Sequence, residues 1–179
     1  MSIVGVIGRK RAGKDFLYEI ISKYRNVERL AFADSLKKLC ASIYKLDKSF
    51  FFNDDKKDEV IPGLNVTPRE IVCEVGQLYK KKFGNNFWAN ILNQQIHSDK
   101  HYVVTDVRFP REAEILKEQG AQLIYIDADF RLGELPYNAD RSEKAVYETR
   151  NQFLNDCIII SNNDCKEKFK LQSIFLLKL

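Results

Sequence analysis

Three residues near the start of the chain, Gly8, Gly13 and Lys14, have the spacing of a loop that binds nucleotide phosphates. An apolar run over residues 3–7 precedes the loop and apolar residues at helical spacing follow it, so the loop joins a strand to a helix. The first N–H groups of a helix have no partner within it and lie at the positive end of its dipole, so a phosphate completes such a site. The strand, the spacing and Lys14 together favour a phosphate site over a glycine turn with solvated basic residues.

Asp15 stands where such loops usually carry a serine or threonine hydroxyl that binds Mg²⁺. Its carboxylate has three open alternatives: it binds the ion directly, holds it through water, or pairs with a neighbouring cation. Arg9, Lys10 and Arg11 add three cations inside the loop. These charges repel one another unless an anion docks there or solvent screens them.

A second candidate lies where the apolar run beginning at His101 ends in Asp106, two residues before Arg108. Enzymes that use nucleoside triphosphates hold Mg²⁺ with a carboxylate at a strand tip beside the phosphate loop, and we predict this role for Asp106. The planar fork of Arg108 suits either a phosphate or that carboxylate. Taken without the loop, Asp106 fits better an ordinary strand-ending residue that caps a turn, and its combination with residues 8–15 favours the functional role.

Strand and helix patterns alternate along the chain and position these residues. Strand-like runs lie at about 2–7, 28–32, 101–106, 121–127 and 156–161, and helical patterns at about 14–24, 34–45, 67–82, 86–98, 110–119 and 164–177. This alternation predicts an α/β fold, a parallel sheet of about five strands with helices on both faces. Ligands bind such sheets beyond the carboxyl ends of the strands, which is where both candidates lie.

The segment between the two candidates is helical. Thr67 and Pro68 have the pattern of an N-cap followed by proline at the first helical position, which makes Arg69 either an exposed first-turn residue or an anion contact. Gly84 is expected to end this helix, with an asparagine capping the next. Trp88, the single tryptophan, is expected in the core, with packing near a base as the alternative.

Residues 129–140 have no clear period, and an irregular stretch of about a dozen residues inside a compact domain is typical of a lid or binding element. Lids exclude water from phosphoryl transfer. Arg131 and Arg141 are positioned to stabilise the transferred group as arginine fingers do, the alternative being a solvated surface loop.

Composition narrows the protein class. The 179 residues are 45% hydrophobic, which predicts one globular domain, and their net charge of +4 is spread along the chain rather than gathered in the basic stripe of a nucleic-acid-binding protein. No apolar run of membrane-spanning length and no signal-peptide pattern occur, so we expect a soluble, intracellular protein. The cysteines form no close metal-ligand pair, and we expect mostly buried, reduced thiols at Cys40, Cys73, Cys157 and Cys165.

Taken in order, the motifs resemble the phage and viral deoxynucleoside monophosphate kinases across almost the whole chain. The matching segments are Gly8 to Asp15, Phe32 to Lys37, Thr67 to Glu70, Val75 to Leu78, Asn86 to Trp88, Thr105 to Phe109 with Glu112, Ser142 with Glu143, and Ser161 to Asp164. The Gly-Lys-Asp loop also resembles that of the animal-type phosphomevalonate kinases. One departure is Asp140-Arg141, where many relatives carry a histidine shortly before the Ser-Glu pair.

The resemblance implies a three-layer P-loop fold, similar to the nucleoside monophosphate kinases, as a single domain over residues 1–179. An acceptor-binding helical insertion is expected over about 34–98 and a lid over about 128–150. The implied reaction transfers the γ-phosphoryl group of ATP, with Mg²⁺, to a deoxynucleoside monophosphate. The alternatives are a phosphomevalonate-like or other small-molecule kinase, and a non-catalytic nucleotide-sensing module.

Carried over by position, the resemblance assigns three sets of residues. The donor set is Gly8, Lys10, Arg11, Ala12, Gly13, Lys14, Asp15, Phe16, Asn162 and Asn163. The acceptor set is Asp34, Lys37, Arg69, Gln77, Trp88, Asp106, Arg108, Glu112, Ser142 and Glu143. The catalytic cations are Lys14, Arg108, Arg131 and Arg141, and the Mg²⁺ carboxylates are Asp15 and Asp106.

The expected partners are small molecules only, with no nucleic acid and no membrane. A homodimer is left open. The expected location is the cytoplasm, meaning the host cytoplasm or a viral factory if the protein is viral.

Overall fold

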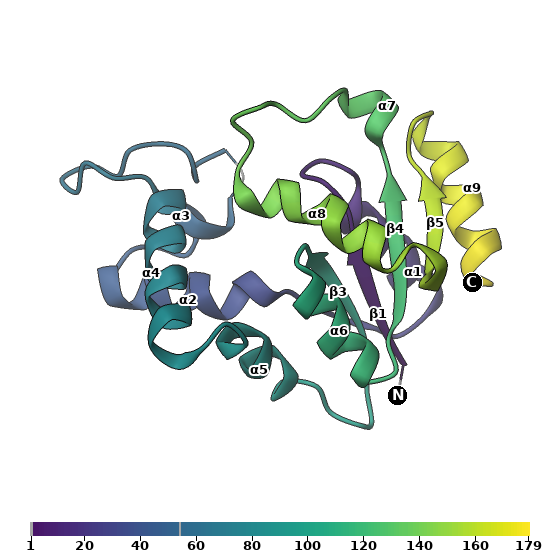
Figure 1. Cartoon of the computed structure of the whole chain (residues 1–179), viewed down its shortest axis with the longest axis horizontal. Helices are drawn as coiled ribbons and strands as arrows, with labels where there is room; N and C mark the ends of the chain where they lie inside the picture. Colours follow the sequence, from purple (N-terminus) through teal and green to yellow (C-terminus); the bar gives the residue numbers. More distant parts are fainter. Residues whose placement is uncertain (1, 54) are drawn as a thin grey trace. The chain divides into compact units, whose positions relative to one another are not determined.

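The computed structural model describes residues 2–53 and 55–179 (Figure 1). The strands are β1 (Ser2–Ile7), β2 (Glu28–Leu30), β3 (His101–Val107), β4 (Gln122–Asp127) and β5 (Cys157–Ser161). The helices are α1 (Lys14–Tyr24), α2 (Phe32–Tyr44), α3 (Ser49–Phe52), α4 (Pro68–Phe83), α5 (Phe87–Asn93), α6 (Pro110–Glu118), α7 (Asp129–Leu132), α8 (Arg141–Gln152) and α9 (Lys166–Leu177), with a short 3₁₀ turn at Leu154–Asp156.

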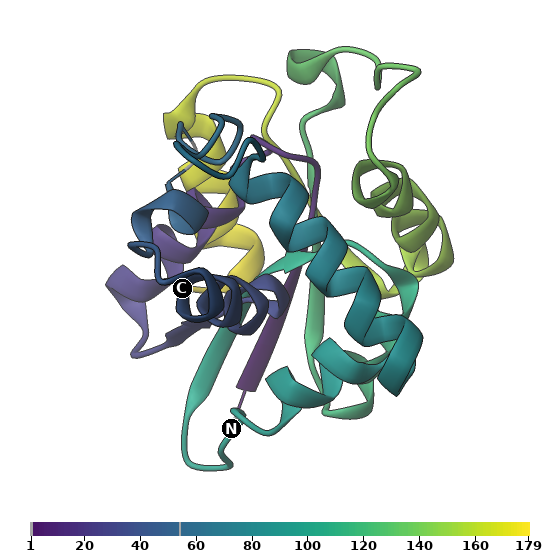
Figure 2. The same cartoon turned by 90° about the vertical axis from the view of Figure 1, so that its left-hand side faces the viewer.

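The strands form one parallel sheet in the order β2-β3-β1-β4-β5. Helices α1 and α9 pack together on one face and α6 and α8 on the other, as the turned view in Figure 2 shows. This is the predicted α/β fold with a five-stranded parallel sheet covered on both sides, and the prediction is confirmed.

The apolar run of β1 explains why that strand lies at the centre of the sheet. It hydrogen-bonds to β3 on one side and β4 on the other, and Val6 and Ile7 have no exposed surface. A strand buried on both faces needs a nearly continuous apolar sequence rather than an alternating one. Leu17 and Ile20 of α1 pack against the same core, which fixes the loop between β1 and α1 at both ends.

By its internal contacts, the chain divides into two compact units. The sheet unit comprises Met1–Ala31 and Ile96–Leu179, and the helical unit comprises Phe32–Gln95. A single domain with an insertion over about 34–98 stays a prediction.

The helical unit has its own core, in which Cys40, Phe51 and Trp88 are buried. Helix α4 begins as predicted: the Thr67 hydroxyl accepts from the N–H of Glu70, the Glu70 carboxylate accepts from the N–H of Thr67, and Pro68 takes the first turn. It ends as predicted at Gly84, whose φ of 97° suits glycine.

Some element predictions are wrong. Residues 141–152 form α8, and the stretch 129–140, expected to be irregular, contains the single turn of α7. Another single turn, α3, was not predicted, and α5 is shorter than the pattern over 86–98. The sequence pattern did not predict helix α8 because few of its residues are apolar. The hydrophobic residues that it buries are Ala145 and Val146.

All four cysteines are free thiols, as expected of reduced residues. The expectation that most are buried is wrong, because Cys40 is buried and Cys157 half-buried but Cys73 and Cys165 are exposed. The last two occupy solvent-facing positions on α4 and at the start of α9.

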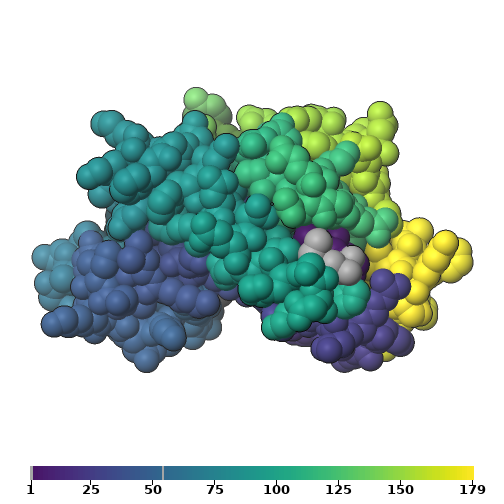
Figure 3. Space-filling model, turned by 90° about the horizontal axis from the view of Figure 1, so that it is seen from below, coloured from purple at the N-terminus to yellow at the C-terminus, as the bar shows by residue number. Residues whose placement is uncertain are grey.

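The strand arrows in Figure 1 point upward, so the view from below in Figure 3 shows the side of their amino ends. There a cavity of about 410 Å³ is lined by Ser2, Arg25, Asn26 and His101, and the Ser2 hydroxyl lies 2.8 Å from His101 Nδ1. This cavity is at the opposite end of β1 from the glycine loop. None of the helices in the described part of the chain has the length and apolar character of a membrane span.

Candidate functional site

The loop between β1 and α1 is folded by its glycines and by contacts to its backbone carbonyls. Gly13 has a φ of 106° at the N-cap of α1, and Arg11 has a φ of 65°. A side chain at Gly13 would also collide with Asn162, whose Nδ2 lies 2.6 Å from the position a Cβ would take. Conformation and space both require glycine there, so the N–H groups that begin α1 stay open to a ligand.

The Lys14 ammonium is buried inside the loop. Its Nζ donates to the carbonyls of Gly8 at 2.8 Å and Arg9 at 2.7 Å. An ammonium has three N–H donors, so one is left after these two bonds. The backbone holds this lysine in a fixed position with one donor available to an anion.

The electrostatic surroundings of Lys14 suit an anion as well. Burial and, to a lesser extent, the charge of Arg108 lower its pKa to about 8, although the charges of Glu143, Asp106 and Asp15 act in the opposite direction. The cationic form therefore lacks full compensation in the ligand-free protein. A phosphate group would supply the missing negative charge.

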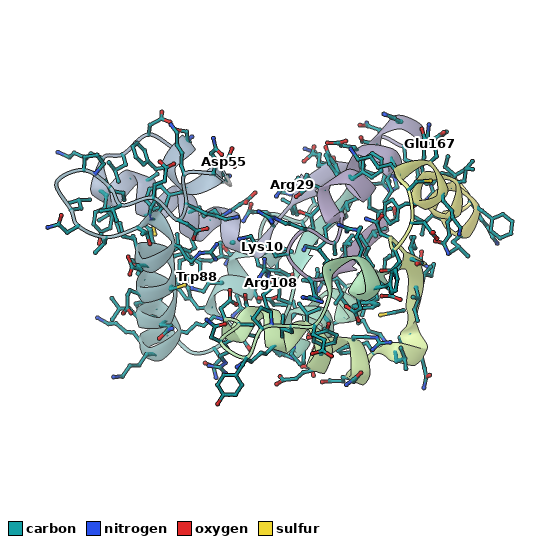
Figure 4. All side chains as sticks on the ribbon, turned by 90° about the horizontal axis from the view of Figure 1, so that it is seen from above. Lys10, Arg29, Asp55, Trp88, Arg108 and Glu167 are labelled. Carbon is teal, nitrogen blue, oxygen red and sulfur yellow. The ribbon has the colours of Figure 1, made fainter. Side chains whose placement is uncertain are left out.

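Arg108 and Glu143 form an ion pair beside the loop. Arg108 Nη1 donates to Glu143 Oε1 and to the Ser142 hydroxyl, both at 2.7 Å. Glu143 also accepts from the Lys10 N–H at 2.9 and 3.1 Å, which brings the side of the loop that carries Lys10 to Arg108 (Figure 4). The sequence left open two partners for Arg108, a phosphate or the Asp106 carboxylate. The carboxylate that it binds in the structure is that of Glu143.

The elements that carry Arg108 hold it firmly. Glu112 accepts from the Arg108 N–H at 2.9 Å, and Thr149 donates to the Arg108 carbonyl at 2.7 Å. Glu112 also accepts from the Phe109 N–H and so caps the start of α6. Its observed contacts are therefore structural, although the resemblance placed it among the acceptor residues.

Arg131 joins the loop to the turn after β5. Its Nε donates to the Asn162 carbonyl at 2.9 Å and its Nη2 to the Arg11 carbonyl at 2.8 Å, while its N–H donates to Asn163 Oδ1 at 3.2 Å. Asn162 in turn donates from Nδ2 to the Ala12 carbonyl at 2.8 Å. Arg131, expected in the lid, thus brings the predicted donor residues of the loop and of the last turn together.

The remaining predicted residues of the sheet unit occupy distinct positions. The Phe16 ring stacks on Phe169 with centroids 5.9 Å apart, which makes it a packing residue of α1 and α9. Arg141 is the exposed first residue of α8, and the Ser142 hydroxyl donates to Asp140 at 2.6 Å. A cavity of about 400 Å³ lies between the loop and the segment leading into α8, lined by Arg9, Lys10, Arg11, Leu132, Glu134, Leu135, Pro136, Ala139, Asp140 and Glu143.

The other predicted acceptor residues belong to the helical unit. Arg69 forms a two-pronged ion pair with Asp58, in which Nη2 to Oδ2 is 3.2 Å. The Lys37 ammonium lies 5.1 Å from the centre of the Phe52 ring.

Trp88 is buried in the core of the helical unit, as its core alternative predicted, and donates to the Gly76 carbonyl at 3.2 Å. Asp34 lies in the first turn of α2, and Gln77 is exposed on α4.

Comparisons with known proteins agree with this geometry. No protein-family model matches the chain. A relative from Acanthamoeba polyphaga mimivirus, described as "Putative deoxynucleotide monophosphate kinase", is 26% identical over 186 residues, or 93% of this chain and 92% of the relative. This relative confirms the resemblance to the viral enzymes predicted from the motifs.

The solved structures point to one fold. Dephospho-CoA kinase from Campylobacter jejuni superposes with a TM-score of 0.51 at 16% identity, covering 98% of this chain and 95% of that one. A Thermus thermophilus protein also gives 0.51, at 11% identity, with 99% and 96% covered. The chain has the P-loop kinase fold.

In a P-loop kinase fold, Mg²⁺ arrives with the nucleotide and takes one or two protein carboxylates, the other ligands being phosphate oxygens and water. Asp15 and Asp106 both raise the pKa of Lys14, so two carboxylates lie near the ammonium. Residues 2–53 and 55–179 contain no group of three or more His, Cys, Asp and Glu that would cage a metal alone. The residues present fit an ion that shares its ligands with a nucleotide.

Of the three alternatives for Asp15, the structure records the pairing with a cation. Its Oδ1 lies 3.4 Å from Arg29 Nε, and both side chains are exposed enough for this pair to be weak. An exposed pair of this kind exchanges readily with another partner.

Arg9 is the residue of this P-loop kinase fold that motif reasoning missed. It is 7% exposed, donates to the Gly133 carbonyl at 2.6 Å and to the Tyr147 hydroxyl at 3.3 Å, and lies 3.6 Å from Asp129. Burial and the hydrogen bond to Asp129 raise the pKa of Tyr147. The partners in these contacts are about 120 or more positions apart in the sequence, so no local sequence pattern predicts them.

Proposed function

We propose that the protein is an ATP-dependent kinase that converts deoxynucleoside monophosphates to diphosphates. The observation that carries the proposal is the buried Lys14 ammonium, bound to the carbonyls of Gly8 and Arg9 with its third N–H left for a phosphate oxygen. The choice of a deoxynucleotide rests on the similarity to the viral relative.

The donor half follows from the loop. The N–H groups of Gly8 to Asp15 and the start of α1 are proposed to hold the phosphates of ATP, with Asn162 and Asn163 bordering its base. Mg²⁺ would be held by Asp15 and Asp106 together with phosphate oxygens, and would neutralise charge between the two terminal phosphates. The role of Phe16 is to keep α1 in place by its stacking on Phe169.

Phosphoryl transfer requires alignment and positive charge rather than a strong base, because its transition state is loose and the charge is spread over the phosphoryl oxygens. We assign that charge to Lys14, Arg108 and a lid arginine. Arg141 is the favoured lid residue, because its side chain is exposed at the start of α8 whereas Arg131 is bound to one carbonyl of the loop and one of the turn after β5. Arg131 is proposed to keep the loop in shape.

On the resemblance, the acceptor residues are proposed to be Asp34, Lys37, Arg69 and Gln77 in the helical unit, and Ser142 and Glu143 in the sheet unit. Arg69 is held in place by Asp58, which accepts from its Nε and Nη2. Trp88 supports this region from the core.

The test is an ADP-release assay on the full chain with ATP and Mg²⁺. The acceptor panel contains all common deoxynucleoside and nucleoside monophosphates, phosphomevalonate, and a sample without acceptor. We expect ADP release that depends on a deoxynucleoside monophosphate, lost in Lys14→Ala, and a raised acceptor KM in Arg69→Ala with Asp58→Asn as the matched control. Release with phosphomevalonate alone would support the other kinase class, and ATP binding without acceptor-dependent release would support a sensing module.

A further inference from the structure

The side chain of Glu143 occupies the phosphate loop. Glu143 is 8% exposed, and both of its carboxylate oxygens accept from the Lys10 N–H, at 2.9 and 3.1 Å. Glu143 comes from the first turn of α8, about 130 residues away in sequence, where the Asp140 side chain caps the helix by accepting from the Glu143 N–H at 3.0 Å. A buried carboxylate on a loop N–H is an anion in a site built for anions.

The same carboxylate contacts the loop at the peptide group that also binds Lys14. The peptide group between Arg9 and Lys10 accepts from Lys14 through its carbonyl and donates to Glu143 through its N–H. The lysine of such loops reaches the β and γ phosphates, and the charge of Glu143 acts on Lys14, so the carboxylate lies in the region proposed for the γ-phosphate. Glu143 also holds Arg108, one of the proposed catalytic cations.

We propose that Glu143 is an internal competitor of the γ-phosphate, which holds the Lys10 N–H and Arg108 in the nucleotide-free protein and must release both when a triphosphate binds. The inference rests on the proposed function, since it takes the loop as the donor site. A carboxylate and a phosphate repel each other and cannot share one N–H and one guanidinium. The cavity of about 400 Å³ that Lys10, Asp140 and Glu143 line gives the carboxylate space to leave.

This competition makes Glu143 a specificity-determining residue for the donor. A triphosphate must displace the Glu143 carboxylate before its γ-phosphate can bind. The affinity of the protein for the triphosphate is therefore reduced by the free energy of this displacement. A diphosphate that stops at the β position leaves Glu143 in place and meets no competitor. After transfer, Glu143 returns to Lys10 and Arg108 and keeps the product diphosphate from gaining those contacts.

The test compares Glu143→Gln and Glu143→Asp with Glu148→Gln, which removes the same charge from an exposed position on the same helix. The binding of the nonhydrolysable triphosphate AMP-PNP and of ADP, each with Mg²⁺, is measured by titration calorimetry on the full chain. We expect Glu143→Gln to bind AMP-PNP about tenfold more tightly, with ADP affinity changed less than about twofold, on the scale of one charge-assisted hydrogen bond. Glu143→Asp, whose shorter side chain withdraws from Lys10, should gain less, and Glu148→Gln should match the native protein.

Equal or weaker AMP-PNP binding in a folded Glu143→Gln protein, as judged by circular dichroism, would overturn the inference and leave the proposed kinase activity standing. Should Glu143→Gln fail to fold, the same criterion applies to Glu143→Asp. Absence of AMP-PNP binding in the native protein and in both variants would overturn the inference and the proposed function together.

Discussion

The buried ammonium of Lys14 should make the affinity for ATP depend on pH. In the ligand-free protein its pKa is about 8 instead of the ordinary 10.5, because the ammonium is buried. Since one pKa unit is worth about 1.4 kcal/mol, the protein destabilises the charged form of Lys14 by about 3 kcal/mol. Bound phosphate charge offsets this cost and raises the pKa again.

We expect the affinity for ATP to fall as the pH rises above 8. Below pH 8 Lys14 already carries its proton, so ATP binding takes up little. Above pH 8 the free protein has lost that proton and must regain it on binding, so the affinity for ATP falls by up to about tenfold for each further pH unit. If the phosphates restore the ordinary pKa, the total loss is limited to the same 3 kcal/mol or so, a few hundredfold.

Titration calorimetry in two buffers of different ionisation enthalpy measures this proton uptake directly. At pH 9 we expect an uptake approaching one proton per ATP bound, and at pH 7 close to none from this group. Lys14→Met should bind more weakly and lose the uptake. If the native protein takes up no proton on ATP binding at pH 9, or if Lys14→Met takes up as much as the native protein, Lys14 is not the group whose pKa the phosphates raise.

The same group affects the ligand-free stability in the opposite direction. Between pH 8 and 10.5 the unfolded chain holds the Lys14 proton and the folded protein does not. Unfolding then takes up a proton, so this residue makes the free energy of unfolding rise with pH in that window. Denaturant titrations of native protein and Lys14→Met at pH 7.5 and 9.5 separate this contribution from that of other groups.

Two further predictions concern packing and exposure. Trp88→Ala should lower the free energy of unfolding by about 3–5 kcal/mol in denaturant titrations, because it empties a core position; a raised acceptor KM with stability intact would instead make Trp88 a ligand contact. With a thiol reagent at pH 8, two cysteines should react rapidly and two slowly, because burial raises the pKa of Cys40 and Cys157 to about 11 while Cys73 and Cys165 are exposed. Four equal rates would contradict the burial described.

The parts of this protein that sequence reasoning predicted well are those governed by local patterns. The apolar run of β1 and the cap at Thr67 each specify their structure within a few residues, since burial on both faces and the pairing of helix N–H groups act over that range. The start of α8 carried a similar signal in Asp140 followed by Glu143, an N-cap with glutamate at the third helical position. Its apolar face was too narrow for periodicity to identify it.

The contacts that complete the site were beyond such patterns. Arg131 was expected to act in a lid, yet its partners are carbonyls of the loop and of the turn after β5. Glu143 carried a lid assignment from the resemblance, but its position on the Lys10 N–H depends on how α8 packs against the sheet unit. Long-range placements of this kind depend on tertiary packing, and residue spacing does not encode them.

The central position of β1 determines when the site is able to form during protein synthesis. Ser2 pairs opposite His101 on one side and Val4 opposite Gln122 on the other, so β1 has neither of these sheet partners until much of the chain after it has been made. Parallel pairing between such distant segments closes long loops and is therefore a late folding event. Translation products that stop before β3 would contain every glycine of the loop and still lack both strands that pair with β1.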